Sequence, residues 1–207
     1  LPVAPETEAR FQRAANEATE KAHAWLSRHP DDVEGTFLLG SAYAFKSSYE
    51  LSIRHSRLSA SKDASRTFKV ISGLVRKHAD VVDAGAITGA FSVVAASLDF
   101  KTKLVALLFL GINGDLNGGR RDLEDANERA FVENDDAGLL LSILYTRERK
   151  YDLALDKLAR LGSRYPDNYL VQLEMAALHL IAGKPDAAAR IYRDLLARNS
   201  PQLERAI

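Results

Sequence analysis

Residues 113–124, NGDLNGGRRDLE, match most of a known calcium-binding loop pattern, D-x-[DN]-x-[DN]-G-x5-E. Asp115 and Asn117 fall at the third and fifth positions of this pattern, Gly118 falls at the sixth and Glu124 at the twelfth. Carboxylate and amide oxygens are the ligands that calcium prefers in such loops. Asp115, Asn117 and Glu124 are therefore the candidate metal ligands of this chain.

The same stretch also has features that oppose calcium binding. The first position is Asn113 where the pattern has Asp, and Arg120 and Arg121 occupy the eighth and ninth positions. Two adjacent cations disfavour a dication in a loop with two carboxylates. A second interpretation is a turn and close-packing point between helices, and a third is anion binding at a helix N-terminus. The repeat register described below favours the second interpretation, so we assign no metal site.

The composition narrows the classes of function. The 207 residues include 28 Lys and Arg, 28 Asp and Glu, and no Cys. The absence of cysteine excludes thiol catalysis, disulfides and cysteine-based zinc sites. Nucleic-acid binding normally requires a basic excess or a concentrated basic stripe, and we find neither in the sequence. The five histidines form no HExxH pattern, which is typical of a zinc site. From the missing metal motif we expect no cofactor, and from the charge balance we expect no nucleic-acid partner.

Helical periodicity dominates the chain, and no segment alternates like a strand. Apolar residues at three-and-four spacing predict a helix over 8–28, and Asp31 or Asp32 is placed to cap a second helix that ends near 46. The absence of Gly and Pro from 41 to 72 predicts a long helix over 50–78, with a break at SASKDAS as an alternative. The uncharged run at 84–98 is too short to span a bilayer, so we expect a buried helix pair and no transmembrane segment; a membrane hairpin formed with residues 104–112 is the alternative.

A repeat of 34 positions runs through the C-terminal third of the chain. Ala154 and Ala188 lie 34 positions apart, as do Leu161 and Leu195. Helical patterns cover 136–149, 151–164, 168–182 and 185–198, and short turns rich in charge or helix breakers separate them. A 34-residue helix–turn–helix period is that of the tetratricopeptide repeat (TPR).

The residues at key repeat positions also resemble the TPR family. The positions that match its large, aromatic, small and proline sites are Leu39, Gly40, Tyr43, Leu141, Tyr145, Tyr151, Ala154, Pro166, Gly183 and Ala188. The resemblance implies an all-α fold, a right-handed superhelix of about four antiparallel helix pairs that is irregular in the middle. It implies a single domain over 1–207, with regular repeats at 136–200 and degenerate repeats at 17–135. In this register Gly119 takes the small-residue position of Ala154.

The stretches AYAFKSSYEL, LGINGD and LLLSILYTRERKYDLAL also resemble a bacterial group of secreted or envelope TPR proteins of unknown function. This resemblance favours an extracytoplasmic or periplasmic location over the cytoplasm. It brings no catalytic residues with it, and the sequence contains no catalytic constellation. We therefore expect a protein that is not an enzyme; an enzyme of unrecognised type remains a third alternative.

In TPR proteins the first helix of each pair lines a groove that binds partner peptides. Carried onto this chain, the groove positions are Phe37, Ser41, Phe45, Leu139, Ile143, Arg147, Leu170, Leu173, Ala177 and Ile181. The groove is either open or filled in part by the segment 50–78 or the segment 101–112. The resemblance implies a scaffold that binds a protein or peptide. The alternative is a calcium-binding or oligomerising envelope protein, whose copies associate through the C-terminal repeat.

Overall fold

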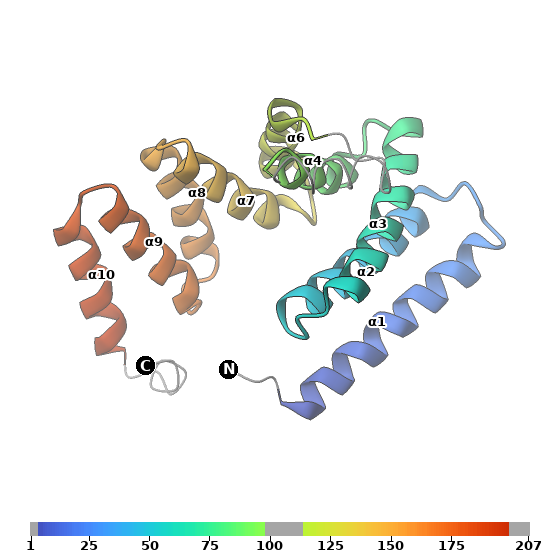
Figure 1. Cartoon of the computed structure of the whole chain (residues 1–207), viewed down its shortest axis with the longest axis horizontal. Helices are drawn as coiled ribbons and strands as arrows, with labels where there is room; N and C mark the ends of the chain where they lie inside the picture. The colour runs from blue at the N-terminus through green and yellow to red at the C-terminus, as the bar shows by residue number, and fades with distance from the viewer. Residues whose placement is uncertain (1–3, 98–113, 199–207) are drawn as a thin grey trace. The chain divides into compact units, whose positions relative to one another are not determined.

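The computed structural model describes residues 4–97 and 114–198. Within these ranges the chain forms nine α-helices and no β-strand, which confirms the all-α prediction (Figure 1). The chain divides into two compact units, unit 1 over Leu1–Asp122 and unit 2 over Leu123–Ile207. Among the described residues, no helix combines the length and the hydrophobicity that crossing a bilayer requires.

Unit 1 is built from α1 (Pro5–Leu26), α2 (Val33–Ser52), α3 (Arg57–Lys77), α4 (Val82–Ser97) and the first half of α6 (Leu116–Arg129). The Asp32 carboxylate accepts a hydrogen bond from the Gly35 amide and so caps α2, as expected from the sequence. The predicted end of this helix near 46 is wrong, because α2 continues to Ser52.

The break between α2 and α3 lies at residues 53–56. The long helix predicted over 50–78 is therefore α3, which begins seven residues later than predicted, and the alternative break at SASKDAS is wrong. His55 adopts a left-handed backbone conformation with φ 53°, and the Ser56 amide donates to the Glu50 carbonyl oxygen at 2.8 Å. A left-handed residue reverses the chain at a helix end even without glycine. The polar segment SASKDAS lies inside the unbroken helix α3.

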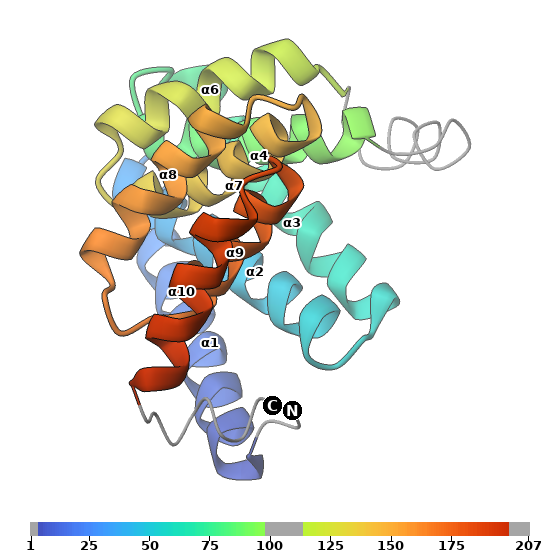
Figure 2. The same ribbon diagram turned by 90° about the vertical axis from the view of Figure 1, so that its left-hand side faces the viewer.

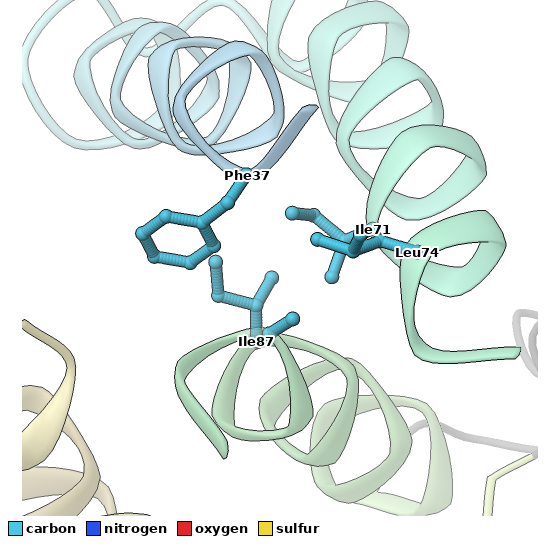
Figure 3. Packing of buried hydrophobic residues seen from close by; sticks show 5 residues of the cluster. Phe37, Ile71, Leu74 and Ile87 are labelled. Carbon is cyan, nitrogen blue, oxygen red and sulfur yellow. The ribbon is translucent and has the colours of Figure 1, made fainter. Parts of the chain in front are cut away.

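The core of unit 1 lies where α2, α3 and α4 meet. Phe37 of α2, Ile71 and Leu74 of α3, and Ile87 of α4 point toward one another (Figure 3). Ile71 is fully buried, and a Cβ added to Gly40 would overlap its Cδ1 atom. Glycine therefore lets α2 and α3 approach closely at this point.

Unit 2 contains the second half of α6 and two helix pairs, α7 (Asn134–Arg147) with α8 (Tyr151–Arg164), and α9 (Tyr169–Ile181) with α10 (Pro185–Ala197). The predicted helices over 136–149, 151–164, 168–182 and 185–198 agree with these within two residues. Ala154 and Ala188, which the sequence places one repeat apart, are both fully buried.

The turns within the two pairs are built alike. Arg149 and Gly183, 34 positions apart, both have left-handed backbones, with φ 59° and 73°. One residue later, the Lys150 amide donates to the Tyr145 carbonyl oxygen and the Lys184 amide to that of His179, both at 2.8 Å. The repeat therefore extends to the backbone conformation of the turn.

This pair of turns provides a matched test of backbone strain. A left-handed conformation costs a residue with a Cβ about 1–2 kcal/mol and costs glycine almost nothing. Arg149→Gly is therefore expected to raise the free energy of unfolding of unit 2 by about 1 kcal/mol, and Gly183→Ala to lower it by about as much. Urea denaturation followed by circular dichroism checks both predictions. Two variants that change the free energy of unfolding in the same direction would contradict the shared turn.

Candidate functional site: an apolar groove between two helices

An open groove with a volume of about 580 Å³ lies between α1 and α2, which run side by side (Figure 1). Each helix contributes side chains at three-and-four spacing, the spacing of one helix face. The described lining residues are Ala18, Lys21, Ala22 and Trp25 of α1, Asp32, and Glu34, Gly35, Leu38, Ser41, Ala42 and Phe45 of α2.

Three large apolar side chains dominate this groove. Trp25 is 45% exposed, Leu38 54% and Phe45 56%, although each lies beside apolar neighbours that could have buried it. Single exposed apolar residues are ordinary, whereas several that line one concave surface mark a binding site. The groove is therefore the candidate functional site of unit 1.

Local packing fixes the tryptophan at one end of the groove. The Trp25 ring lies against the His29 ring, with 4.2 Å between ring centroids. A Cβ added to Gly35 would come within 2.9 Å of Trp25 Cδ1, so the missing side chain lets α2 begin directly beside the indole. The indole is therefore in contact with His29 and the start of α2, while the residue is 45% exposed.

Four of the described lining residues are polar or charged, namely Lys21, Asp32, Glu34 and Ser41. The Ser41 hydroxyl is buried and has no hydrogen-bond partner within the described part of the chain. Lys21 lies at the edge and forms an ion pair with Glu17 at 2.7 Å. The hydrogen bond to Glu17 raises the pKa of the Lys21 ammonium and lowers the pKa of the Glu17 carboxyl, so both groups are charged at neutral pH.

The predicted groove positions of unit 1 do not all lie in this groove. Ser41 and Phe45 line it, as expected. Phe37 does not, because its ring is 9% exposed and belongs to the core cluster with Ile71. The family register places Phe37 on the groove side, but in this unit α3 packs on the face of α2 that carries Phe37. Among the described lining residues none belongs to α3, so α3 does not fill this groove.

The predicted groove positions of unit 2 lie on α7 and α9. Leu139, Ile143 and Arg147 are exposed on α7, at the spacing of one helix face. Leu173 and Ala177 of α9 are half-buried, and Leu170 and Ile181 are exposed. None of these positions lines the groove between α1 and α2, and all but Arg147 are apolar. The segment 101–112, which was considered as a groove filler, lies outside the described residues.

Sequence reasoning missed Trp25 and Leu38. The stripe Ala18, Ala22 and Trp25 predicted an amphipathic helix, and an amphipathic stripe is normally buried against a neighbour. In the structure α1 buries Ala15 and Ala22, while Ala18 and Trp25 are exposed. The feature that could have indicated this groove is Trp25 beside the small residues Ala18 and Ala22. A large aromatic ring beside small side chains leaves a hollow that a side chain of a binding partner can occupy.

The candidate calcium ligands do not come together. Residues 116–124 are helical, and nine helical residues rise about 13 Å, whereas ligands of one calcium ion lie about 2.3–2.6 Å from it. Asp115 caps α6 by accepting a hydrogen bond from the Gly118 amide at 2.9 Å, and Glu124 accepts one from the Tyr145 hydroxyl at 2.8 Å. Asn117 contacts Arg120. Asn113 lies outside the described residues.

Gly119, within this stretch, lies at a close contact between helices. A Cβ added to Gly119 would lie 2.6 Å from the carbonyl oxygen of Gly89, so α4 and α6 approach each other closely at two glycines. This agrees with the expectation that Gly119 occupies a small-residue packing position. No group of three or more His, Asp or Glu side chains that could hold a metal ion occurs in the described ranges.

Comparisons with known proteins add no family or homologue to this description. No family model matches the chain, and neither a curated protein nor a solved structure matches it significantly. The case for a function therefore rests on the groove and on the repeat.

Proposed function

We propose that the protein is a non-enzymatic interaction module of the TPR type, in which the groove between α1 and α2 binds an apolar helical segment of a partner protein. The observation that carries the proposal is the exposure of Trp25, Leu38 and Phe45 along one concave surface. Large apolar and aromatic side chains in a preformed groove are the usual anchors of protein binding.

The repeat supports the TPR part of this proposal. The 34-position spacing recurs in the buried alanines Ala154 and Ala188 and in the left-handed turn residues Arg149 and Gly183. Arrays of such helix pairs ordinarily serve as binding surfaces, although a fold by itself is a weak argument for function.

The polarity of the groove favours a helical ligand over an extended one. An extended peptide needs backbone partners along its length, whereas a helix satisfies its own backbone groups and presents side chains alone. The exposed surface of the groove is chiefly carbon, and the Ser41 hydroxyl is buried. The lining residues of α1 and α2 recur every three or four positions. A ligand helix with apolar residues at positions i, i+4 and i+7 has the same spacing along one face and therefore fits this surface.

A displayed library of helical peptides with varied surface residues tests the proposal. Selection against the full chain is expected to enrich peptides with one apolar stripe. The selected peptides are expected to bind Leu38→Asp and Phe45→Asp at least about tenfold more weakly, since each change places a charge where an apolar side chain would be buried.

Leu196→Asp is the matched control, because Leu196 is an exposed leucine of α10 in unit 2. It is expected to bind the selected peptides as the unchanged chain does. Circular dichroism of all three variants shows whether the helices are retained. The groove assignment is wrong if the selected peptides bind both groove variants as tightly as the control.

A further inference from the structure

The second surface of interest is the exposed face of α3, which is strongly basic. The helix carries six cationic side chains and one acidic one, Asp63, which is buried. The cations are Arg57, Lys62, Arg66, Lys69, Arg76 and Lys77. The expectation that the chain contains no concentrated basic stripe is therefore wrong for this helix.

Four of these cations share one face of α3. Lys62, Arg66, Lys69 and Arg76 are spaced by four, three and seven residues, which places them within about 80° of one another around an α-helix. All four are exposed, and the row extends about 21 Å along the helix axis. The stripe was hidden in the sequence because it requires α3 to run unbroken from Arg57 to Lys77. We call these four residues the cationic stripe.

Three members of the cationic stripe have no acidic partner within the described ranges. Arg66 forms an ion pair with Asp63 at 3.0 Å and lies over the Tyr43 ring. No ion pair of Lys62, Lys69 or Arg76 occurs among the described residues. Glu50 pairs with Arg54 and Asp31 with Lys77. Asp80 and Asp83 follow Arg76 by four and seven residues, and within the described ranges neither forms an ion pair with it. The stripe thus presents positive charge that the fold does not neutralise.

Exposed aliphatic side chains lie at one end of this stripe. Leu51 is 53% exposed, Ile53 44% and Leu58 83%, and all three lie at the turn between α2 and α3. Figures 1 and 2 show this turn at the end of the α2–α3 hairpin remote from α4. Leu58 and Lys62 are four residues apart and therefore adjacent on one helix face. We call Leu51, Ile53 and Leu58 the apolar tip.

The combination of the two features discriminates between anionic ligands. Nucleic acids attract cations through phosphates, and their unstacked bases bind exposed aromatic rings. The one aromatic residue of α3, Phe68, instead packs against the Phe91 ring, with 5.6 Å between ring centroids. Aliphatic side chains exposed beside unpaired cations match a bilayer surface, where cations meet anionic headgroups and apolar side chains enter the boundary of the acyl chains.

We propose that unit 1 binds the surface of a membrane that contains anionic lipids, with the cationic stripe on the headgroups and the apolar tip inserted among the acyl chains. This surface is distinct from the groove between α1 and α2: none of the stripe or tip residues lines that groove. Membrane binding and peptide binding can therefore be tested separately.

Flotation with lipid vesicles tests this proposal on the full chain. The chain is expected to float with vesicles of phosphatidylcholine and phosphatidylglycerol and to stay behind with phosphatidylcholine alone. Each cation near an anionic surface contributes roughly a fivefold gain in affinity, so the triple variant Lys62→Gln, Lys69→Gln, Arg76→Gln is expected to bind on the order of a hundredfold more weakly. High salt is expected to weaken binding of the unchanged chain in the same direction.

Matched controls separate this site from general charge and general hydrophobicity. The triple variant Arg160→Gln, Arg190→Gln, Arg193→Gln removes the same charge from exposed positions of unit 2 and is expected to bind vesicles normally. Leu58→Ser is expected to weaken vesicle binding about tenfold, whereas Leu196→Ser is expected to leave it unchanged.

Three results would overturn the proposal. The first is equal vesicle binding by the α3 triple variant and the unchanged chain. The second is a loss of vesicle binding in the unit 2 triple variant as large as the loss in the α3 triple variant. The third is tighter binding to duplex DNA than to anionic vesicles with no effect of Leu58→Ser, which would assign the stripe to a nucleic acid. Circular dichroism of each variant is measured as well, because only a variant that keeps its helices can attribute a loss of binding to the altered surface.

Discussion

Replacing Ile71 by alanine is expected to lower the free energy of unfolding of unit 1 by about 2–5 kcal/mol. The side chain is 0% exposed and lies among Phe37, Leu74 and Ile87, so the change removes buried carbon atoms and leaves a cavity that these neighbours fill only in part. Domains are stable by about 5–15 kcal/mol, so this single change removes a large share of the stability.

Urea denaturation measures this loss through the fluorescence of Trp25, which is the single tryptophan of the chain and lies in unit 1. Leu58→Ala is the matched control, because Leu58 lies on the same helix but is 83% exposed. Its effect is expected to stay within about 0.5 kcal/mol. Equal losses for the two variants would contradict the core where α2, α3 and α4 meet.

Adding one methyl group at Gly119 is expected to lower the free energy of unfolding by about 1–3 kcal/mol. The new Cβ of Gly119→Ala would lie 2.6 Å from the Gly89 carbonyl oxygen and 3.0 Å from Val93. The first of these neighbours is backbone and cannot rotate away, so α4 and α6 must separate. This loss exceeds the gain that alanine normally gives inside a helix.

Gly85→Ala makes the same chemical change with the opposite expected sign. Gly85 lies in α4, and apart from its chain neighbours and the backbone of its own helix, no described atom lies within 4 Å of the Cβ that alanine would add there. This variant is expected to gain about 0.5–1 kcal/mol from helix propensity alone. Urea denaturation midpoints compare the two variants, and the midpoint of Gly119→Ala is expected to be the lower. Equal midpoints would contradict the close approach of α4 and α6.

The C-terminal helices could be predicted well from the sequence because local signals agree there. Short breakers separate the segments, and each helix has one apolar stripe with a small residue such as Ala154 or Ala188 at the contact. The break between α2 and α3 carries no glycine or proline, and His55 reverses the chain by adopting an uncommon conformation. No composition rule predicts that choice, so the helix bounds in this region were wrong.

The site was predicted only in part because its residues depend on which helix faces are covered. Ser41 and Phe45 line the groove, whereas Phe37 is buried because α3 packs against the face of α2 that carries it. Trp25 and Leu38 are exposed because no described helix of unit 1 covers the groove face of α1 and α2. An apolar pattern shows that a face is to be covered, and it does not show whether this chain or a partner covers it.

The fluorescence of Trp25 tests the central claim most directly, because this indole lines the groove and is the single tryptophan of the chain. Titration with a helical peptide selected against the unchanged chain is expected to shift the emission to shorter wavelength and to protect the indole from acrylamide quenching. The same titration of Phe45→Asp is expected to leave both signals unchanged. Saturable binding of the peptide with no change at Trp25 would show that the groove between α1 and α2 is not the binding site.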